Sequence, residues 1–534
     1  MADDKRVYLF DTTLRDGAQT QGVDFGVADK IAIAQALDRL GLDYVEGGWP
    51  GANPTDDAFF AEPPAFETAA LVAFGMTRRA GRSAENDPGL SALLNARAER
   101  ICMVGKTWDF HVDVALGIER SENVAMIADS VAHARTRKAE VMFDAEHFFD
   151  GYKANAAYAL ECIKGAYEAG ARWVVLCDTN GGTLPDEVER IVGAVTEHIP
   201  GSHLGIHAHN DTDNAVANSL VAVRAGARQV QGTLNGLGER CGNANIISLI
   251  ANFVLKTDYD VGIDADRLTQ LTTVSHLLDE RLNRAPAKNA AYVGDSAFAH
   301  KGGLHVSAVE KDPRTYEHID PQLVGNQRHF VVSDQAGRSN ILARFRELAL
   351  EVDESKVGGL VEQVKAREFE GFAYDGAEAS FELLASRAMG EVPDYFKLSR
   401  FRVMDDRRWS ARGDLVTESE ATVTVEVAGN HQMTVANGNG PVHALDTALR
   451  KALVPVYPQL VDMRLVDYKV RILTPQAGTG AVTRVMIESA DSSGRRWTTV
   501  GVSTNIIDAS YNALHDGITW KLLHDGAAVP EAAA

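Results

Sequence analysis

The feature that most constrains the fold of this chain is a regular alternation of strand-like and helix-like segments. From the N-terminus to about residue 255, short β-rich runs alternate with helical stretches at a period of about 30 residues. The strand-like runs lie near Val7, Tyr44, Leu71, Ile101, Val141, Trp173, Leu204 and Gln229. The helical stretches have apolar residues at helical spacing, and the first one ends at Gly41. Eight such units predict an α/β fold with a closed TIM (β/α)8 barrel.

The rest of the sequence divides into two further parts. We expect a catalytic barrel over residues 1–260 and a helical linker subdomain over residues 261–400; that the linker completes the active site is implied by the family resemblance described below. We expect a C-terminal α+β domain over residues 401–534 that contains a duplicated unit of strands and one helix; its regulatory role is implied by the family resemblance described below. Two copies could form a small-molecule sensor, or equally a dimerisation module without a ligand.

Composition limits the partners and the location. The net charge of −21 argues against nucleic acid and anionic membranes, which require a basic surface. No run approaches the roughly 18 apolar residues of a membrane span, and the first residues lack the features of a signal peptide, so we expect a cytoplasmic protein. Four cysteines, Cys102, Cys162, Cys177 and Cys241, form no C-x-x-C pair. We expect buried free thiols.

Polar residues gather where the predicted strands end. They are Asp11, Arg15, Asp16, Glu46, Glu146, Asp178, His207, His209 and Asn235. The carboxyl ends of the strands form the active-site face of a TIM barrel. Scattered surface residues would not favour one end of every strand, so the pattern predicts a catalytic barrel.

Two histidines suggest a metal site on this face. His207 and His209 stand at i and i+2 on one strand, so their side chains share a face. A lone H-x-H is more often a pair of ordinary polar residues, but Asp16 follows the first strand and Asn243 follows the last, and closure of the barrel brings these strands together. This mixed oxygen and nitrogen set suits a divalent ion, Zn, Mn or Mg, with open positions for a chelating 2-oxo acid.

Three other residues suit such a substrate. Arg15 can place its guanidinium where negative charge develops on a carbonyl oxygen or an enolate, and its structural alternative is a salt bridge to Glu46. The two roles can coexist. Thr179 offers a hydroxyl to the substrate carboxylate, with a helix N-cap as its alternative role.

The motifs DTTLRDGAQTQG, GIHAHND, NGLGERCGN and AHKGGLHVSA, the last followed by TYEHIDP, resemble the 2-isopropylmalate, homocitrate and citramalate synthase family. The resemblance spans nearly the whole chain. It implies that Asp16, His207 and His209 are metal ligands with Asn243 as a fourth contact. It also implies that Arg15 faces the substrate carbonyl with Glu46 as its support, that Thr179 contacts the substrate carboxylate and that Glu146 lines the substrate pocket. Finally, it implies that His305 and Tyr316 are a catalytic pair. In this family the pair comes from the other subunit of a homodimer, so active sites are shared.

Within the family, VEGGWPGANPTD, VGKTWDFHV and FDAEHFFDG look most like the citramalate branch. That resemblance implies an acyltransferase that condenses acetyl-CoA, the co-substrate, with pyruvate, as an early step of isoleucine biosynthesis. His305, or a water that it activates, would remove a proton from the acetyl methyl group. The C-terminal repeat is similar to the family's regulatory domain, which senses an end-product amino acid, here isoleucine.

Three alternatives remain open from the sequence. The chain could be a 2-isopropylmalate synthase that uses 2-oxoisovalerate, or a lyase of the HMG-CoA lyase type, although that lyase resembles only the barrel. It could also be an amino-acid-binding regulator with an inactive barrel. Retention of Arg15, Asp16 and both histidines argues against an inactive barrel.

Overall fold

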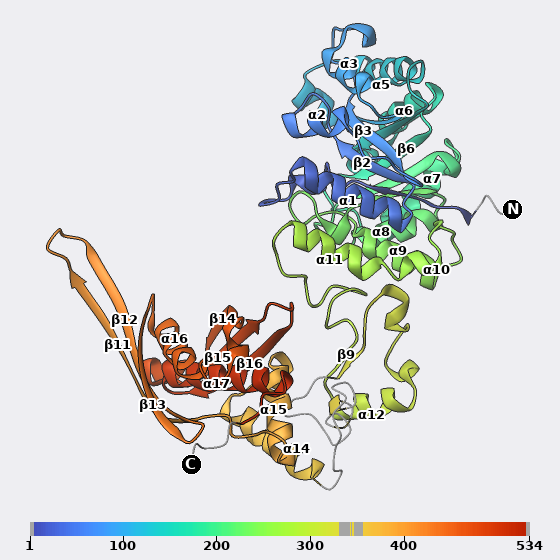
Figure 1. Cartoon of the computed structure of the whole chain (residues 1–534). Coiled ribbons are helices and arrows are strands. Elements are labelled where there is room, and N and C mark those ends of the chain that lie inside the picture. The colour runs from blue at the N-terminus through green and yellow to red at the C-terminus, as the bar shows by residue number, and fades with distance from the viewer. Residues whose placement is uncertain (1–4, 331–341, 343, 346–355, 530–534) are drawn as a thin grey trace. The chain divides into compact units, whose positions relative to one another are not determined.

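A computed structural model describes residues 5–330, 342, 344–345 and 356–529. It divides into two compact units, and each is considered by itself (Figure 1). The first unit comprises Met1–Phe298 and His318–Arg328, and the second comprises Ala299–Glu317 and His329–Ala534. The predicted domain boundaries near residues 260 and 400 remain predictions.

The first unit is built on a closed barrel of eight strands in sequence order. The strands are β1 (Tyr8–Asp11), β2 (Tyr44–Gly48), β3 (Ala70–Met76), β4 (Arg100–Lys106), β5 (Glu140–Glu146), β6 (Trp173–Asp178), β7 (Leu204–Ala208) and β8 (Gln229–Gly232). Neighbouring strands pair in parallel, and β1 pairs with β8 through Tyr8↔Gln229 and Asp11↔Gly232, which closes the barrel. The predicted TIM barrel is therefore confirmed.

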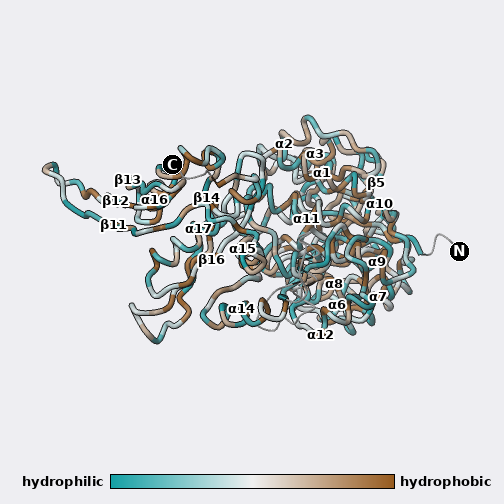
Figure 2. The backbone as a smooth tube through the Cα atoms, turned by 60° about the horizontal axis from the view of Figure 1, so that its bottom comes forward, coloured by the Kyte–Doolittle hydropathy of each residue, from teal (hydrophilic) through white to brown (hydrophobic). Residues whose placement is uncertain are grey.

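Helices cover the outside of the barrel (Figure 1). They are α1 (Val27–Leu40), α2 (Pro54–Ala61), α3 (Pro88–Asn95), α4 (Asp109–His111), α5 (Arg120–Arg135), α6 (Phe148–Glu168), α7 (Pro185–Thr196), α8 (Ala215–Arg224), α9 (Ile246–Lys256), α10 (Ala265–Leu268) and α11 (Leu271–Arg281). Hydrophobic and hydrophilic residues alternate along much of the tube, as Figure 2 shows. In α7, for example, Pro185 stands at the N-terminus and Val188, Ile191, Val192 and Val195 form the buried face.

The interior of the barrel is filled below its active-site end. Side chains alternate along each strand, so Phe10 points inward while its neighbour Leu9 packs in the outer core. The inward set includes the fully buried Trp173, whose Nε1 donates to the Tyr44 hydroxyl at 3.2 Å. Mostly apolar side chains occupy this end, and the polar inward residues of the predicted site lie at the other end.

The second unit contains two similar three-stranded antiparallel sheets. The first is formed by β11 (Lys397–Trp409), β12 (Leu415–Val427) and β13 (Asn430–Gly438), followed by α16 (Pro441–Leu453). The second is formed by β14 (Arg464–Ile472), β15 (Thr483–Ala490) and β16 (Arg496–Ser503), followed by α17 (Ile506–His524). Each helix packs on its sheet, and residues of both repeats share one apolar core. The predicted C-terminal domain of strands and helices is confirmed, with the duplication visible in its element order.

The second unit also holds short elements that precede the sheets. These are β9 (Ala299–His300), α12 (Gly303–Lys311), β10 (His329–Phe330), α14 (Val357–Glu370) and α15 (Glu378–Met389). β9 and β10 pair in parallel, and α15 contacts α17 and β16.

The prediction of buried cysteines is wrong at one position. Cys102, Cys162 and Cys177 are buried free thiols, but Cys241 is exposed. It lies between Arg240 and Gly242, which both have positive φ, in a tight loop rather than in an apolar run. Among the described helices, none is long and apolar enough to cross a membrane. The cytoplasmic location stays a prediction.

Candidate active site

Buried polar side chains from the first strand and the last two strands of the barrel, or from the loops that follow them, meet at the carboxyl ends of the strands. Asp16 lies in the loop after β1, His207 and His209 lie at the end of β7, and Asn243 lies in the loop after β8. An isolated β-bridge between His209 and Asn243 holds these two loops together. The closure of β1 on β8 brings Asp16 to the histidines, as the sequence predicted.

Asp16, His207 and His209 converge on one point. Their ligand atoms all lie within 4.8 Å of one another. The Nε2 atom of His207 lies 3.1 Å from Asp16 Oδ2, and the Nε2 atom of His209 lies 3.8 Å from the same oxygen. The two Nε2 atoms are 3.4 Å apart. Two imidazole nitrogens and a carboxylate in this arrangement can hold a divalent metal ion.

The surroundings of Asn243 fit the same ion. Its amide nitrogen lies 2.6 Å from Asp16 Oδ2 and 3.1 Å from His207 Nε2, while its buried Oδ1 has no partner. Rotation of the amide by half a turn exchanges the two atoms and presents an oxygen ligand to the cluster. A Cβ atom at Gly238 would lie 1.9 Å from Asn243 Oδ1, so glycine there leaves room for this amide.

The protonation states of Asp16 and His209 suit metal binding. Burial, together with the charge of His207, lowers the pKa of His209 to about 3, so its ring is neutral at pH 7. Burial by itself would raise the pKa of Asp16, but the charge of Arg15 and the hydrogen bond to His207 outweigh it and hold the pKa well below its usual range. A neutral imidazole and an ionised carboxylate are the forms that bind metals.

A second layer of polar residues orients His207. Its Nδ1 atom lies 2.7 Å from Gln231 Oε1, which can only accept, so Nδ1 carries a proton and Nε2 faces the cluster. Burial by itself would lower the pKa of His207, but the hydrogen bond to Asp16 and the charge of Asp16 outweigh burial and raise it, so a metal ion at Nε2 would replace a proton there. Gln231 Nε2 in turn donates to Asp144 Oδ1 at 3.0 Å. Burial raises the pKa of Asp144 above its ordinary value.

Arg15 forms the other half of the site. Its Nε donates to Glu46 Oε2 at 2.7 Å, and its guanidinium lies over the Phe74 ring, 3.9 Å from the centroid. Glu46 is fully buried, and burial raises its pKa to about 7 against the opposing charge of Arg15. The structural alternative for Arg15, a salt bridge to Glu46, is thus present. The hydrogen bond through Nε fixes the orientation of the guanidinium group. It does not exclude a contact between the terminal guanidinium nitrogens and a substrate.

Glu146 and Thr179 lie on neighbouring strand ends. Glu146 ends β5 and pairs with Lys106 of β4 at 2.5 Å. Thr179 follows β6, and its hydroxyl oxygen accepts the backbone N–H of His147 at 2.8 Å. Thr179 does not cap α7, which begins at Pro185, so its hydroxyl proton remains able to donate to a carboxylate.

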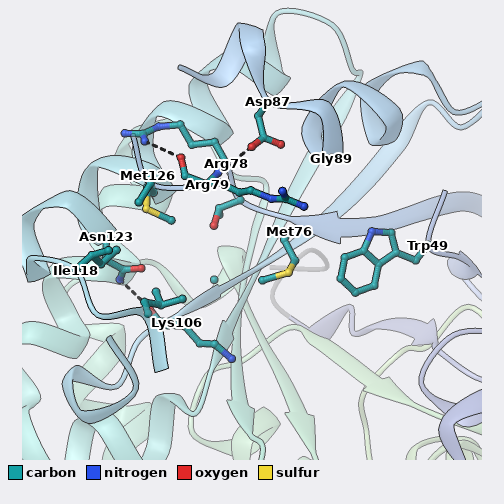
Figure 3. A pocket seen from close by; sticks show the side chains of 14 residues that line it. Trp49, Met76, Arg78, Arg79, Asp87, Gly89, Lys106, Ile118, Asn123 and Met126 are labelled. Atoms are coloured by element: carbon teal, nitrogen blue, oxygen red, sulfur yellow. Dashed lines mark hydrogen bonds between the residues drawn. The ribbon is translucent and has the colours of Figure 1, made fainter. Parts of the chain in front are cut away.

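Two cavities of about 400 Å³ each have Trp49 in their lining. Arg15 and Trp49 line one of them. The other, seen in Figure 3, combines apolar walls with basic side chains and is lined in part by Trp49, Met76, Arg79, Lys106, Ile118 and Met126. Trp49 borders both cavities and contacts Phe74 edge to face, with ring centroids 5.4 Å apart. Space for two small molecules therefore lies on either side of Trp49.

Family models match three successive segments of the chain. Residues 6–274 match HMGL-like, residues 292–370 match the homocitrate synthase post-HMGL domain-like model, and residues 375–522 match the LeuA allosteric (dimerisation) domain. An (R)-citramalate synthase from Aquifex aeolicus is 50% identical over 525 residues, which cover 98% of both chains. An (R)-citramalate synthase from Streptomyces coelicolor is 48% identical and covers 99% of both.

The chain belongs to the citramalate synthase family.

A 2-isopropylmalate synthase from Carboxydothermus hydrogenoformans is 30% identical over 527 residues, with 98% of both chains covered. The (R)-citramalate synthases from Aquifex aeolicus and Streptomyces coelicolor therefore share many more residues with this chain than that relative does.

His305 and Tyr316 belong to the second unit, apart from the other predicted site residues, which all belong to the first. His305 lies on α12, and its ring stacks on Tyr316 with centroids 4.1 Å apart and an interplanar angle of 29°. Both side chains are exposed. Their assignment as a catalytic pair of this family member stays a prediction.

Other polar residues at the strand ends have structural partners. The Asp11 carboxylate accepts from Thr13, and Asp178 accepts from Thr183. Asn235 donates to the backbone carbonyl of Ser275 at 3.0 Å. These three residues stabilise the loops that carry the site.

The sequence analysis did not single out Gln231, Asp144 or the buried Lys30, which contacts the loops of Arg15 and Glu46. Gln231 and Asp144 could have been found from the sequence, because each is a polar residue on the inward side of a predicted strand. Gln231 stands in register with His207, and Asp144 stands two residues before Glu146.

We expect Gln231→Leu to weaken binding of a divalent metal by about 10- to 100-fold, because His207 loses the acceptor that fixes its tautomer. Competition with a chelating dye on metal-free protein measures the Kd. The control is Gln229→Leu, which changes the same residue type on the same face of β8 but next to Met142. Equal Kd values for Gln231→Leu and wild type would contradict the assignment.

Proposed function

We propose that this chain condenses acetyl-CoA with pyruvate to give citramalate and free CoA. The observation that carries the proposal is 50% identity with (R)-citramalate synthases over 97–98% of this chain. The reaction is a Claisen-type acyl transfer in which the acyl group becomes an alkyl group. It would serve an early step of isoleucine biosynthesis.

Asp16, His207 and His209, with Asn243 beside them, would hold a divalent metal, which supplies Lewis acidity to the 2-oxo acid when bound. The chemistry of the donors suits Zn, Mn or Mg, and the identity of the metal is left to experiment. All four side chains are buried, so little bulk water reaches the cluster.

The first task of the protein is to bind and polarise pyruvate. The guanidinium of Arg15 would donate to the pyruvate carbonyl oxygen, where negative charge develops as a C–C bond forms. Glu46 holds that guanidinium through a 2.7 Å hydrogen bond. The Thr179 hydroxyl would donate to the pyruvate carboxylate, and Glu146 would border the substrate pocket.

The second task is to make the nucleophile. His305, assisted by Tyr316, would accept a proton from the methyl group of acetyl-CoA, and the resulting enolate carbon would attack C2 of pyruvate. The alkoxide formed at C2 takes up a proton. Water then cleaves the thioester, so that citramalate and the CoA thiol leave.

Acetyl-CoA needs a site that accepts an apolar chain and a polyanionic nucleotide. The cavity of Figure 3 supports binding there, because Met76, Leu116 and Met126 provide apolar walls and Arg79 a basic group. A local basic group matters in a chain with a net charge of −21, because screening limits the mean field to roughly 8–10 Å.

The C-terminal repeat supports assembly and regulation. Residues 375–522 match an allosteric dimerisation domain. We propose a homodimer in which His305 and Tyr316 of each chain complete the barrel of the other. We further propose isoleucine, the end product of the proposed pathway, as the effector of the repeat.

Pyruvate should support the fastest release of CoA among 2-oxo acids. We expect kcat/KM for pyruvate to exceed that for 2-oxoisovalerate at least tenfold, about 1.4 kcal/mol of transition-state discrimination. A thiol reagent measures CoA release across a panel of 2-oxo acids. A preference for 2-oxoisovalerate would favour the isopropylmalate alternative, and no CoA release with any 2-oxo acid would overturn the proposed reaction.

Reversal of the charge at Arg79 should weaken acetyl-CoA binding selectively. We expect Arg79→Glu to raise the KM for acetyl-CoA roughly tenfold and to leave the KM for pyruvate within about twofold. The matched control is Arg82→Glu, an exposed arginine of the same loop that is not among the residues lining the cavity. An equal effect of both variants would point to the general field of the protein rather than to the cavity.

Mixed dimers test the shared site. Arg15→Ala and His305→Ala homodimers should each be nearly inactive, because one loses carbonyl polarisation and the other the base. Co-expressed chains should recover about a quarter of wild-type activity, because random mixing makes half of the dimers heterodimers with one intact site of two. If the mixture stays as inactive as the parents, each site is made within one chain.

A further inference from the structure

A buried lysine lies beneath the Arg15–Glu46 pair. Lys30, on the first turn of α1, has a side chain only 4% exposed. Its Nζ donates to the backbone carbonyl of Leu14 at 2.9 Å, to that of Gly47 at 3.0 Å and to the carboxylate of Asp56. These three bonds use every proton of the ammonium group.

The two backbone carbonyls that accept from Lys30 belong to residues next to Arg15 and Glu46. Leu14 immediately precedes Arg15, and Gly47 immediately follows Glu46. One ammonium group thus joins the backbone on the β1 side of the ion pair to the backbone on its β2 side. Arg15 lies in the loop after β1 and Glu46 lies on β2, so their separation depends on how these two backbones are held.

Asp56 anchors the ammonium group from α2. Its Oδ2 accepts the backbone N–H of Trp49 at 2.8 Å and the side-chain amide of Asn53 at 3.0 Å, and its Oδ1 faces Lys30. The charge of Lys30 is therefore paired, as burial requires. Trp49, which borders both cavities, is held by the same carboxylate.

The sequence after Glu46 keeps space for this arrangement. A Cβ atom at Gly48 would lie 2.5 Å from Asp56 Cγ, and the φ of Gly48 is +141°. A Cβ atom at Gly47 would lie 2.5 Å from the Phe59 ring of α2. Only glycine at both positions lets α2 approach β2 closely enough for Asp56 to reach Lys30.

We propose that Lys30 is a positioning residue for the condensation, because its ammonium group fixes the separation of Arg15 and Glu46. It acts through Arg15 and does not touch substrate. This inference rests on the proposed function. The competing interpretation is an ion pair that stabilises the barrel without setting the geometry of Arg15.

A double-mutant cycle separates the two interpretations. Lys30→Met is combined with Arg15→Ala, and kcat and KM are measured with radiolabelled acetyl-CoA for sensitivity. The matched control is Lys138→Met. Lys138 also donates to two backbone carbonyls, Ala96 at 2.9 Å and Ala98 at 2.6 Å, but it precedes β5 at the opposite end of the barrel.

We expect Lys30→Met to lower kcat tenfold or more, with the KM for pyruvate within about threefold, because small misplacement of a catalytic group is costly. In the Arg15→Ala background the same change should lower kcat less than about threefold. Lys138→Met should leave kcat unchanged. An unchanged kcat in folded Lys30→Met, or an equal loss in both backgrounds, overturns the proposal.

If Lys30→Met does not fold, the cycle uses Lys30→Met with Asp56→Asn, which leaves no buried charge unpaired. A crystal structure of the variant gives a readout that is independent of activity. We expect Arg15 Nε and Glu46 Oε2, 2.7 Å apart in the native chain, to separate beyond hydrogen-bond distance. An intact pair overturns the proposal, whereas absent CoA release by the wild type overturns only the proposed reaction.

Discussion

The parallel pairing of β1 with β8 is the contact on which the site depends. It joins residues more than two hundred positions apart in the sequence and places the loop of Asp16 against the end of β7. Without this closure the histidines of β7 would have no carboxylate, and Asn243 would have no cluster to face. The pairing is itself maintained by the apolar layers on both sides of the strands, because backbone hydrogen bonds gain most when water is excluded.

At the carboxyl ends of the barrel strands, buried positive and negative side chains lie close together. Arg15 lies among the carboxylates of Glu46, Asp16 and Asp144, and Lys30 lies below with Asp56. Removal of one partner from a buried pair typically costs about 3–5 kcal/mol, since the other charge is left without compensation. The charges therefore hold one another in place, and this rigidity suits a site that must present donors to a developing oxyanion.

Strand order, barrel closure and the shared face of His207 and His209 could be predicted because they follow from local patterns and from a single topological rule. Gln231 and Asp144 were missed because their role depends on which inward side chains meet across the barrel. Lys30 was missed because a lysine in an amphipathic helix normally faces water. Cys241 was predicted wrongly because its loop, and not the neighbouring apolar residues, decides its exposure.

The central claim is that barrel closure creates a divalent metal site that presents a 2-oxo acid to Arg15. Anomalous diffraction from crystals grown with Mn²⁺ and pyruvate tests it most directly. We expect one strong peak within about 2.0–2.3 Å of the Asp16, His207 and His209 ligand atoms, with pyruvate density between that peak and Arg15. A saturated crystal with no peak at this cluster, or with pyruvate bound away from Arg15, would contradict it.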